Sequence, residues 1–155
     1  MQDKQVDQED LINVNRNMMH ELSEEIEAYC LRHGYSMIMT STGLRYMVYD
    51  STGAGPKAST DDLVTVSYKV SLLNGKEVYS SDYDGAMELV IDRSEIATGF
   101  QEGLKFMSEG NKALMIIPAH LAYGLTGDGD RIGHYKAIVV DTEILKIERH
   151  GGNNE

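Results

Sequence analysis

Five histidines are the side chains in this sequence that could most readily bind a metal or transfer a proton. They are His20, His33, His120, His134 and His150. They are scattered along the chain, and no pair stands at zinc-ligand spacing beside a cysteine or a cluster of carboxylates. The sequence therefore predicts no metal site at these positions.

The other polar motifs do not predict catalysis either. Asp128-Gly129-Asp130 has the start of a calcium loop but lacks the regular ligand ladder and terminal glutamate, so we interpret it as a solvated acidic loop. Cys30 lies near an apolar stripe without a visible base, which indicates a small buried hydrophobe. No Walker loop, dinucleotide fingerprint or nucleophile elbow is present, and the sequence argues against a hydrolase.

The side chains that stand out are aromatic. Phe100 follows Gly99, Tyr123 precedes Gly124 in a long loop, and Tyr68 lies in the middle of a β-rich run. The residues alone leave two interpretations open. These side chains are either core residues with one loop tyrosine, or the walls of an apolar binding site.

Length and charge narrow the possible functions. The chain has 155 residues and 17.2 kDa, about the size of one domain, and can bury a core without disulfides. Its formal charge of −11 argues against binding to nucleic-acid phosphates or to an anionic membrane surface. No apolar run approaches the ~18 residues of a membrane span. We expect a soluble acidic domain that acts on a protein or a small molecule.

The first element that positions these residues is a long helix. Apolar residues recur at steps of three or four, which predicts a helix over residues 8–32 that ends at Gly34. They are Leu11, Val14, Met18, Leu22, Ile26 and Tyr29. The first thirty residues hold two basic and eight acidic side chains. No apolar segment of a signal peptide follows Met1, so the protein is either cytosolic or lacks its leader in this chain.

After Gly34 the pattern changes to strands around one short helix. Asn74-Gly75 predicts a hairpin with a type I′ turn, and residues 51–56 and 118–135 are predicted loops. Phe100, Leu104 and Met107 lie at helical spacing. Strands are predicted over 37–40, 44–49, 63–72, 76–80, 87–91, 113–117 and 137–147. This order indicates an α+β domain, a twisted antiparallel sheet wrapped around one short helix.

Several segments, in order along the chain, resemble the FKBP-type (FK506-binding) peptidyl-prolyl cis-trans isomerases of bacteria. Together they cover about residues 41–148. The segments are 64–68, 73–76, 80–81, 95–104 with its Gly99-Phe100 pair, 107–110, 117–124 with its Tyr123-Gly124 pair, and 139–145. The resemblance implies the same FKBP-like α+β fold and a pocket between helix, sheet and long loop.

The resemblance also implies a set of site residues. Phe100 would form the pocket floor, where tryptophan is common in the family. The amide of Ile96 or Ala97 and the hydroxyl of Tyr123 would bind substrate carbonyls, so Tyr123, Phe100 and Ile96 are the expected catalytic residues. The expected substrate-binding residues are Tyr68, Val78, Tyr79, Met87, Ile96, Ala97, Phe100, Tyr123, Ile132 and Val140.

Some positions depart from the family pattern. Phenylalanine is usual where this chain has Val78, Met87 and Val140, and aspartate is usual at Tyr79. The usual proline pair near Gly133-His134 is also missing. The sequence thus predicts a less aromatic pocket without a buried carboxylate and weak macrolide binding. Val78, Ile132 and Met87, the expected neighbours of the proline, offer no charge partner, which predicts a preference for an apolar residue before proline.

Two functions lead, and a third, a purely structural dimer module, rests on the long N-terminal helix alone. The first is a peptidyl-prolyl isomerase acting on X–Pro bonds of protein chains, without cofactor or metal. The alternative is a protein-binding or chaperone-like module with the same fold and little isomerase activity. In either case the predicted partners are proline-containing polypeptides and not nucleic acids.

The resemblance suggests three regions. They are an N-terminal helical extension (1–35), an isomerase domain (36–148) and a C-terminal tail (149–155). Relatives outside the cytosol often carry such an extension as a dimerisation element, and some bacterial ones are lipoproteins. We therefore expect a periplasmic or outer-membrane lipoprotein whose leader is absent from this chain, or otherwise a cytoplasmic protein. The helix either forms a homodimer or packs on its own domain.

Overall fold

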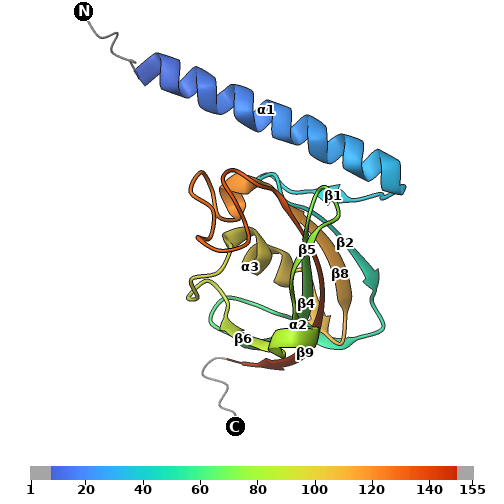
Figure 1. Cartoon of the computed structure of the whole chain (residues 1–155). Helices are drawn as coiled ribbons and strands as arrows, with labels where there is room; N and C mark the ends of the chain where they lie inside the picture. Colours follow the sequence, from blue (N-terminus) through green and yellow to red (C-terminus); the bar gives the residue numbers. More distant parts are fainter. Residues whose placement is uncertain (1–7, 150–155) are drawn as a thin grey trace, which may run out of the picture. The chain divides into compact units, whose positions relative to one another are not determined.

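The computed structural model describes residues 8–149. The chain divides into two compact units, residues 1–35 and residues 36–155 (Figure 1). His150 and the rest of the expected tail beyond Arg149 lie outside the described residues, as do residues 1–7 of the expected extension.

The first unit contains the predicted long helix, α1 (Gln8–His33). Two acidic residues in its first turn and Arg32 and His33 in its last turn complement the helix dipole. At its end the Tyr29 ring stacks on His33, with ring centroids 4.0 Å apart, and the Tyr35 amide donates to the Cys30 carbonyl. Cys30 is buried, as predicted. No helix within residues 8–149 is long and apolar enough to cross a membrane.

The second unit is built on one antiparallel sheet. Its strands are β1 (Ile38–Met39), β2 (Arg45–Asp50), β4 (Leu63–Leu72), β5 (Glu77–Ser80), β6 (Met87–Val90), β8 (Lys112–Ile117) and β9 (Ile138–Glu148). Their order is β1-β2-β8-β9-β4-β5, and β6 also pairs with β4. The longest pairing runs from Leu63 opposite Glu148 to Leu72 opposite Ile138.

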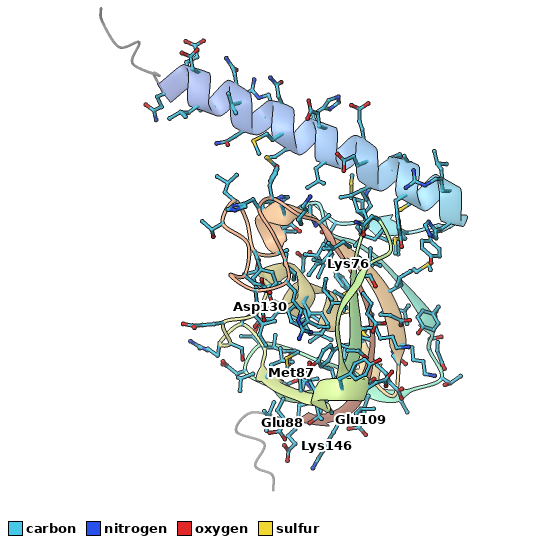
Figure 2. The ribbon with its side chains drawn as sticks, viewed as in Figure 1. Lys76, Met87, Glu88, Glu109, Asp130 and Lys146 are labelled. Atoms are coloured by element: carbon cyan, nitrogen blue, oxygen red, sulfur yellow. The ribbon has the colours of Figure 1, made fainter. Side chains whose placement is uncertain are left out.

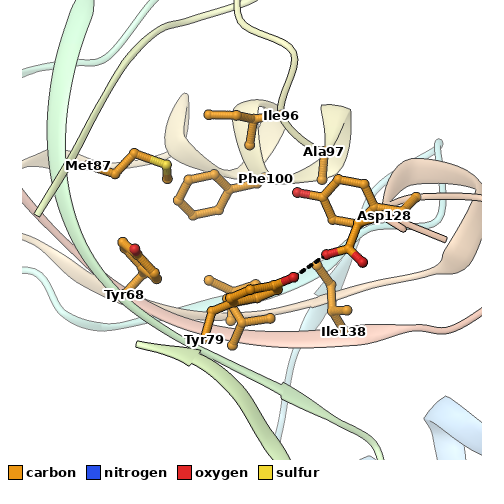
Figure 3. A pocket seen from close by; sticks show the side chains of 11 residues that line it. Tyr68, Tyr79, Met87, Ile96, Ala97, Phe100, Asp128 and Ile138 are labelled. Atoms are coloured by element: carbon orange, nitrogen blue, oxygen red, sulfur yellow. Dashed lines mark hydrogen bonds between the residues drawn. The ribbon is translucent and has the colours of Figure 1, made fainter. Parts of the chain in front are cut away.

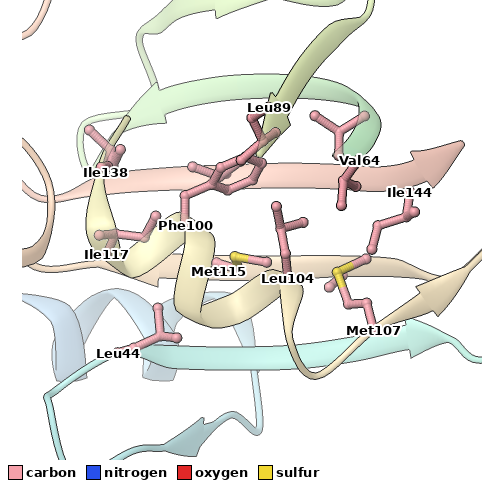
Figure 4. Packing of buried hydrophobic residues seen from close by; sticks show 14 of the residues in the cluster. Leu44, Val64, Leu89, Phe100, Leu104, Met107, Met115, Ile117, Ile138 and Ile144 are labelled. Atoms are coloured by element: carbon pink, nitrogen blue, oxygen red, sulfur yellow. The ribbon is translucent and has the colours of Figure 1, made fainter. Parts of the chain in front are cut away.

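The short helix α3 (Thr98–Leu104) packs against this sheet. Figure 4 shows Phe100 and Leu104 projecting from α3 among the side chains of several strands. Leu104, Val64 and Ile144 have no exposed surface, and each such side chain stabilises the fold by about 1.5–3 kcal/mol. The predicted fold, an antiparallel sheet around one short helix preceded by a long helix, is confirmed.

Two glycines allow α3 to lie close to β8. A Cβ atom on Gly99 would lie 2.6 Å from Cγ2 of Ile117, and one on Gly103 would lie 2.4 Å from Sδ of Met115. Neither distance leaves room for a methyl group without a shift of the neighbouring side chain. The glycine spacing in α3 therefore sets how deeply Phe100 enters the domain.

Some predicted element bounds are wrong. β3 (Ala54–Lys57) pairs with β7 (Ser108–Glu109) where a loop and a helix end were predicted. The helix α2 (Ser81–Asp84), capped by the Ser80 hydroxyl, was not predicted, and α3 ends at Leu104 instead of reaching Met107. The expected 118–135 loop begins with a single 3-10 turn, η1 (Ala119–Leu121). These elements are two to four residues long, too short to produce a periodic pattern.

The β4–β5 hairpin is confirmed, but its turn is not type I′. Gly75 has a φ of 91°, whereas Asn74 is not among the positive-φ residues. The Gly75 amide donates to the Leu72 carbonyl, and the Leu72 amide donates to Lys76. This is the three-residue hairpin loop in which a type I turn is followed by a left-handed glycine.

Candidate functional site

A cavity of about 230 Å³ opens between α3, the sheet and the 118–135 loop (Figure 3). Most of its lining is apolar or aromatic. The lining residues are Tyr68, Val70, Tyr79, Met87, Ile96, Ala97, Phe100, Tyr123, Asp128, Ile138 and Val140. The cavity can hold a small apolar group, with polar atoms available at a few defined places.

Eight of the ten residues expected in the pocket line this cavity. The exceptions are Val78 and Ile132, which are buried in the core at 5 % and 2 % exposure. Neighbouring side chains on a strand point to opposite sides, so Tyr79 faces the cavity and the shorter Val78 turns away from it. Ile132 is held within the loop, where its amide donates to Asp128.

Three lining residues were missed by the sequence analysis. Val70 and Ile138 lie two residues from Tyr68 and Val140 on β4 and β9, so strand alternation could have identified them. Asp128 was interpreted as part of a solvated loop, and no local pattern in the sequence marks it as a pocket residue.

Phe100 forms the floor of the cavity from the first turn of α3. Its side chain is 4 % exposed and its amide donates to the Ala97 carbonyl. Figure 3 shows the Phe100 ring between Met87 and Ala97, with Ile96 on the neighbouring segment. The site therefore has an aromatic floor in the position predicted for it.

Gln101 fixes the segment that carries Ile96 and Ala97. This side chain is 2 % exposed, and its Nε2 donates to the carbonyls of Ile96 at 2.7 Å and Ser94 at 3.1 Å. Its Oε1 accepts from the Asp92 amide at 2.6 Å. A buried amide that makes three hydrogen bonds holds this backbone in one conformation. Sequence reasoning did not identify this residue.

Tyr123 comes from the loop and meets the Ala97 backbone. Burial raises the pKa of the Tyr123 hydroxyl, while a hydrogen bond from the Ala97 amide acts in the opposite direction. Because the net shift in pKa is upward, the hydroxyl is protonated at neutral pH and can donate a hydrogen bond. The two groups expected to bind substrate carbonyls are thus neighbours at one end of the cavity.

A carboxylate lines the pocket, which corrects the expectation that Tyr79 leaves it without one. The Tyr79 hydroxyl donates to Oδ2 of Asp128 at 2.5 Å, and Figure 3 shows this bond at the cavity edge. Oδ1 accepts from the amides of Asp130 and Ile132, both at 2.9 Å. The aspartate lost from β5 is replaced by one from the loop.

These bonds decide the charge of the pair. Burial would raise the pKa of Asp128, but the hydrogen bonds from Tyr79 and from the amides of Asp130 and Ile132 outweigh it and lower the pKa. Burial, followed by the bond to Asp128, raises the pKa of Tyr79 to about 12. At neutral pH the site therefore contains a protonated tyrosine and an ionised aspartate.

The four histidines within the described residues make other contacts. Within residues 8–149 no three His, Cys, Asp or Glu side chains are placed to hold a metal ion. His120 and His134 instead contact the carbonyls of Thr42 and Leu125, each at 2.8 Å, and His33 contacts the Tyr29 carbonyl. His20 faces Glu24 on α1.

A family model for FKBP-type peptidyl-prolyl cis-trans isomerases matches residues 55–145, the segment that contains the whole cavity lining. This chain belongs to that family. The predicted resemblance to this family is therefore confirmed.

Curated relatives and solved structures agree with this assignment. The FKBP-type isomerase FkpA of Escherichia coli K12 is 35% identical over 109 residues, 70% of this chain and 39% of the relative. FkpA of Buchnera aphidicola subsp. Schizaphis graminum is 36% identical over 113 residues, 70% of this chain and 42% of the relative. The chain therefore spans about two fifths of the length of these relatives.

The crystal structure of Escherichia coli FkpA matches with a TM-score of 0.71 at 25% identity, covering 94% of this chain and 75% of that one. A peptidyl-prolyl isomerase structure from Pseudomonas syringae pv. tomato has a TM-score of 0.72 at 22% identity. It covers 86% of this chain and 96% of that chain, and it shows the shared fold.

Proposed function

We propose that this chain is a peptidyl-prolyl cis–trans isomerase that acts on X–Pro bonds of protein chains. The observation that carries the proposal is the apolar cavity over Phe100, with the Ala97 amide and the Tyr123 hydroxyl side by side at its edge. In this proposal the proline ring enters the cavity and the carbonyl before it meets the two donors.

The proposed chemistry needs no nucleophile and no cofactor. Resonance gives the peptide bond double-bond character and a rotation barrier of ~18–20 kcal/mol. The twisted transition state has lost this resonance and is less polar than the planar amide. An apolar cavity therefore binds the twisted form better than the planar one, and this difference in binding lowers the barrier.

The donors contribute to the same difference. A hydrogen bond from Tyr123 to the substrate carbonyl would hold the oxygen out of the amide plane. Gln101 contributes indirectly, because it fixes the backbone that presents the Ala97 amide. We propose Tyr123, Phe100 and the Ile96–Ala97 segment as the catalytic group, with Tyr68, Tyr79, Met87 and Val140 as further substrate-binding residues.

A peptide isomerisation assay tests the proposal. Wild-type protein at micromolar concentration should accelerate cis-to-trans conversion of a short peptide with one X–Pro bond above the spontaneous rate. Phe100→Leu should lower kcat/KM, because a smaller apolar group leaves the floor incomplete. Phe106→Leu is the matched control, since Phe106 stacks on Tyr46 and does not line the cavity.

A wild-type rate at background would overturn the enzyme proposal. If proline peptides still bound to the cavity, the protein would be a binding or chaperone-like module with the same fold. Equal losses in Phe100→Leu and Phe106→Leu would instead indicate a general loss of folding, which the free energy of unfolding of each variant separates from a local effect.

We further propose that the isomerase domain covers residues 36–148 and that α1 forms a homodimer. The support is a set of apolar residues exposed on the N-terminal half of α1, namely Leu11, Ile12, Val14 and Met19. Light scattering of the full chain and of a chain beginning at Met37 tests this. A dimer that becomes a soluble monomer supports it, whereas a monomeric full chain, or aggregation of the shorter chain, contradicts it.

A periplasmic location is proposed with the dimer, because the family members outside the cytosol are those that often carry such a helix. Cell fractionation of the natural full-length protein checks this location. Recovery in the cytosolic fraction would contradict it. A lipid anchor stays a prediction. Release of the protein from cells without detergent would contradict it.

A further inference from the structure

Asp128 differs from the other residues around the cavity because it brings a charge to it. The cavity lining contains three tyrosines and seven uncharged apolar residues besides Asp128. The carboxylate is fixed by the Tyr79 hydroxyl on one oxygen and by the amides of Asp130 and Ile132 on the other. It is therefore held in one place in the wall of the cavity.

Within residues 8–149 the charge of Asp128 is not neutralised by an ion pair. Among the described residues no salt bridge joins Asp128 to a lysine or arginine. The cation nearest in sequence, Arg131, is directed elsewhere. Its guanidinium lies 5.1 Å from the centre of the Tyr79 ring, and Nη1 donates to the Val78 carbonyl at 2.8 Å.

Two further carboxylates influence tyrosines of the cavity. Burial is the main cause of the raised pKa of Tyr79 and of Tyr68, and the charges of Asp130 and Asp84, respectively, add to these shifts. Both tyrosines line the cavity. Asp128 is the one charged residue that the structure describes in the cavity lining, on a chain whose net charge is −11.

We propose that Asp128 is a specificity-determining residue that favours polypeptides with a lysine or arginine beside the X–Pro bond over those with an aspartate or glutamate there. The proposal rests on the proposed isomerase function and names its substrate class. It replaces the apolar preference inferred from Val78, Ile132 and Met87, because two of these do not line the cavity and Asp128 does.

The fixed position of the carboxylate makes such selectivity physically reasonable. An exposed ion pair gains little when two flexible side chains must be ordered, but here one partner is already ordered by three hydrogen bonds. The carboxylate of Asp128 attracts a basic side chain of the peptide and repels an acidic one. Both effects increase the ratio of binding between a lysine peptide and a glutamate peptide. We expect a ratio of about fivefold or more between lysine and glutamate peptides at low ionic strength.

The test uses the full chain and two sets of peptides. In one set the residue before proline is lysine, glutamine or glutamate, and in the other set the residue after proline varies in the same way. Dissociation constants and kcat/KM are measured for each peptide. In at least one set the wild type should favour lysine over glutamate about fivefold or more, and added salt should reduce this ratio.

Three variants then locate the effect. Asp128→Asn keeps the shape and most hydrogen bonds, and should bring the lysine-to-glutamate ratio close to one. Asp128→Glu keeps the charge and should restore part of the ratio. Glu88→Gln is the matched control, because it removes the same charge from an exposed residue next to Met87 on β6 that does not line the cavity (Figure 2). It should leave the ratio unchanged.

The outcomes separate this inference from the proposed function. If the peptides are isomerised without any charge preference in either set, the function stands and the inference is wrong. If no peptide is isomerised, the function is wrong, and the ratio of dissociation constants still decides the inference. A preference that persists in Asp128→Asn would also overturn it. If Asp128→Asn does not fold, three other measurements test the inference. They are the wild-type preference among the lysine, glutamine and glutamate peptides, the effect of salt on this preference, and the preference of Asp128→Glu.

Discussion

The floor of the pocket (Phe100) and its loop wall (Asp128 in the 118–135 loop) are held in place by different interactions. Phe100 stands on α3, which the glycines at 99 and 103 allow to lie against β8, and only 4 % of its side chain is exposed. The loop wall is fixed by hydrogen bonds that converge on Asp128. Apolar packing is almost independent of pH and salt, whereas bonds to a carboxylate depend on its protonation.

Phe100→Ala should have the largest effect on stability. It removes an aromatic ring from the contact between helix and sheet, and we expect a loss of ~3–5 kcal/mol in the free energy of unfolding. Urea melts measure it. Phe106→Ala is the control, and it should cost less because Phe106 is only partly buried beside Tyr46. A loss below ~1 kcal/mol for Phe100→Ala would show that the Phe100 ring does not stabilise the contact between helix and sheet.

Gly99→Ala should be the next largest change. The new methyl group would lie 2.6 Å from Cγ2 of Ile117 and 2.9 Å from Cβ of Leu121, so α3 must shift away from β8. Overpacking of this kind costs about 1–3 kcal/mol. Gly103→Ala should cost less in the same melts, since its methyl group meets the flexible end of Met115. Equal losses of stability in Gly99→Ala and Gly103→Ala would contradict the conclusion that the contact at Gly99 is the less adaptable one.

The sequence predicted the floor residue Phe100 and the loop residue Tyr123 but not the carboxylate of Asp128, for a physical reason. The periodic pattern of the sequence predicts β4, β9 and the short helix after Gly99, and the family resemblance assigns Tyr68, Val140 and Phe100 to the pocket, which they line. The bond between Tyr79 and Asp128 joins residues 49 positions apart and follows no period. A carboxylate lost at one position and supplied from another is visible only once the chain is folded.

Removing the Asp128 carboxylate should weaken the loop wall without unfolding the domain. Asp128→Ala leaves the Tyr79 hydroxyl and two amides without their acceptor, and hydrogen bonds to a charged group contribute about 1.5–3 kcal/mol. We expect a loss of stability in this range. Asp128→Asn should lose less, because its amide oxygen still accepts. If both variants melt like the wild type, the bonds do not hold the loop.

The same bonds predict a pH dependence. The folded pKa of Asp128 lies below its ordinary value of about 3.9, so its carboxylate stabilises the fold above that pH. This contribution is lost as the pH falls through the folded pKa. The difference in stability between the wild type and Asp128→Ala should therefore be constant near neutral pH and shrink below about pH 4. Urea melts of both proteins across this range check it, and a difference that grows on acidification would contradict it.

Tyr123→Phe should have the smallest effect on stability and a measurable one on rate. It removes one hydroxyl, which the Ala97 amide contacts, from a loop residue at the cavity edge. If that hydroxyl binds the substrate carbonyl, its loss costs ~0.5–1.5 kcal/mol, which lowers kcat/KM about two- to tenfold. Because the bond is proposed to hold the carbonyl oxygen out of the amide plane, kcat should fall more than peptide affinity does.

Tyr135→Phe is the matched control for this change. Tyr135 is the last residue of the same loop and does not line the cavity, so the rate should not change. A fall in affinity with kcat unchanged in Tyr123→Phe would mean that the hydroxyl binds the planar and twisted forms equally. The rate enhancement would then come from the apolar floor alone, and the loop residues would contribute only to peptide binding.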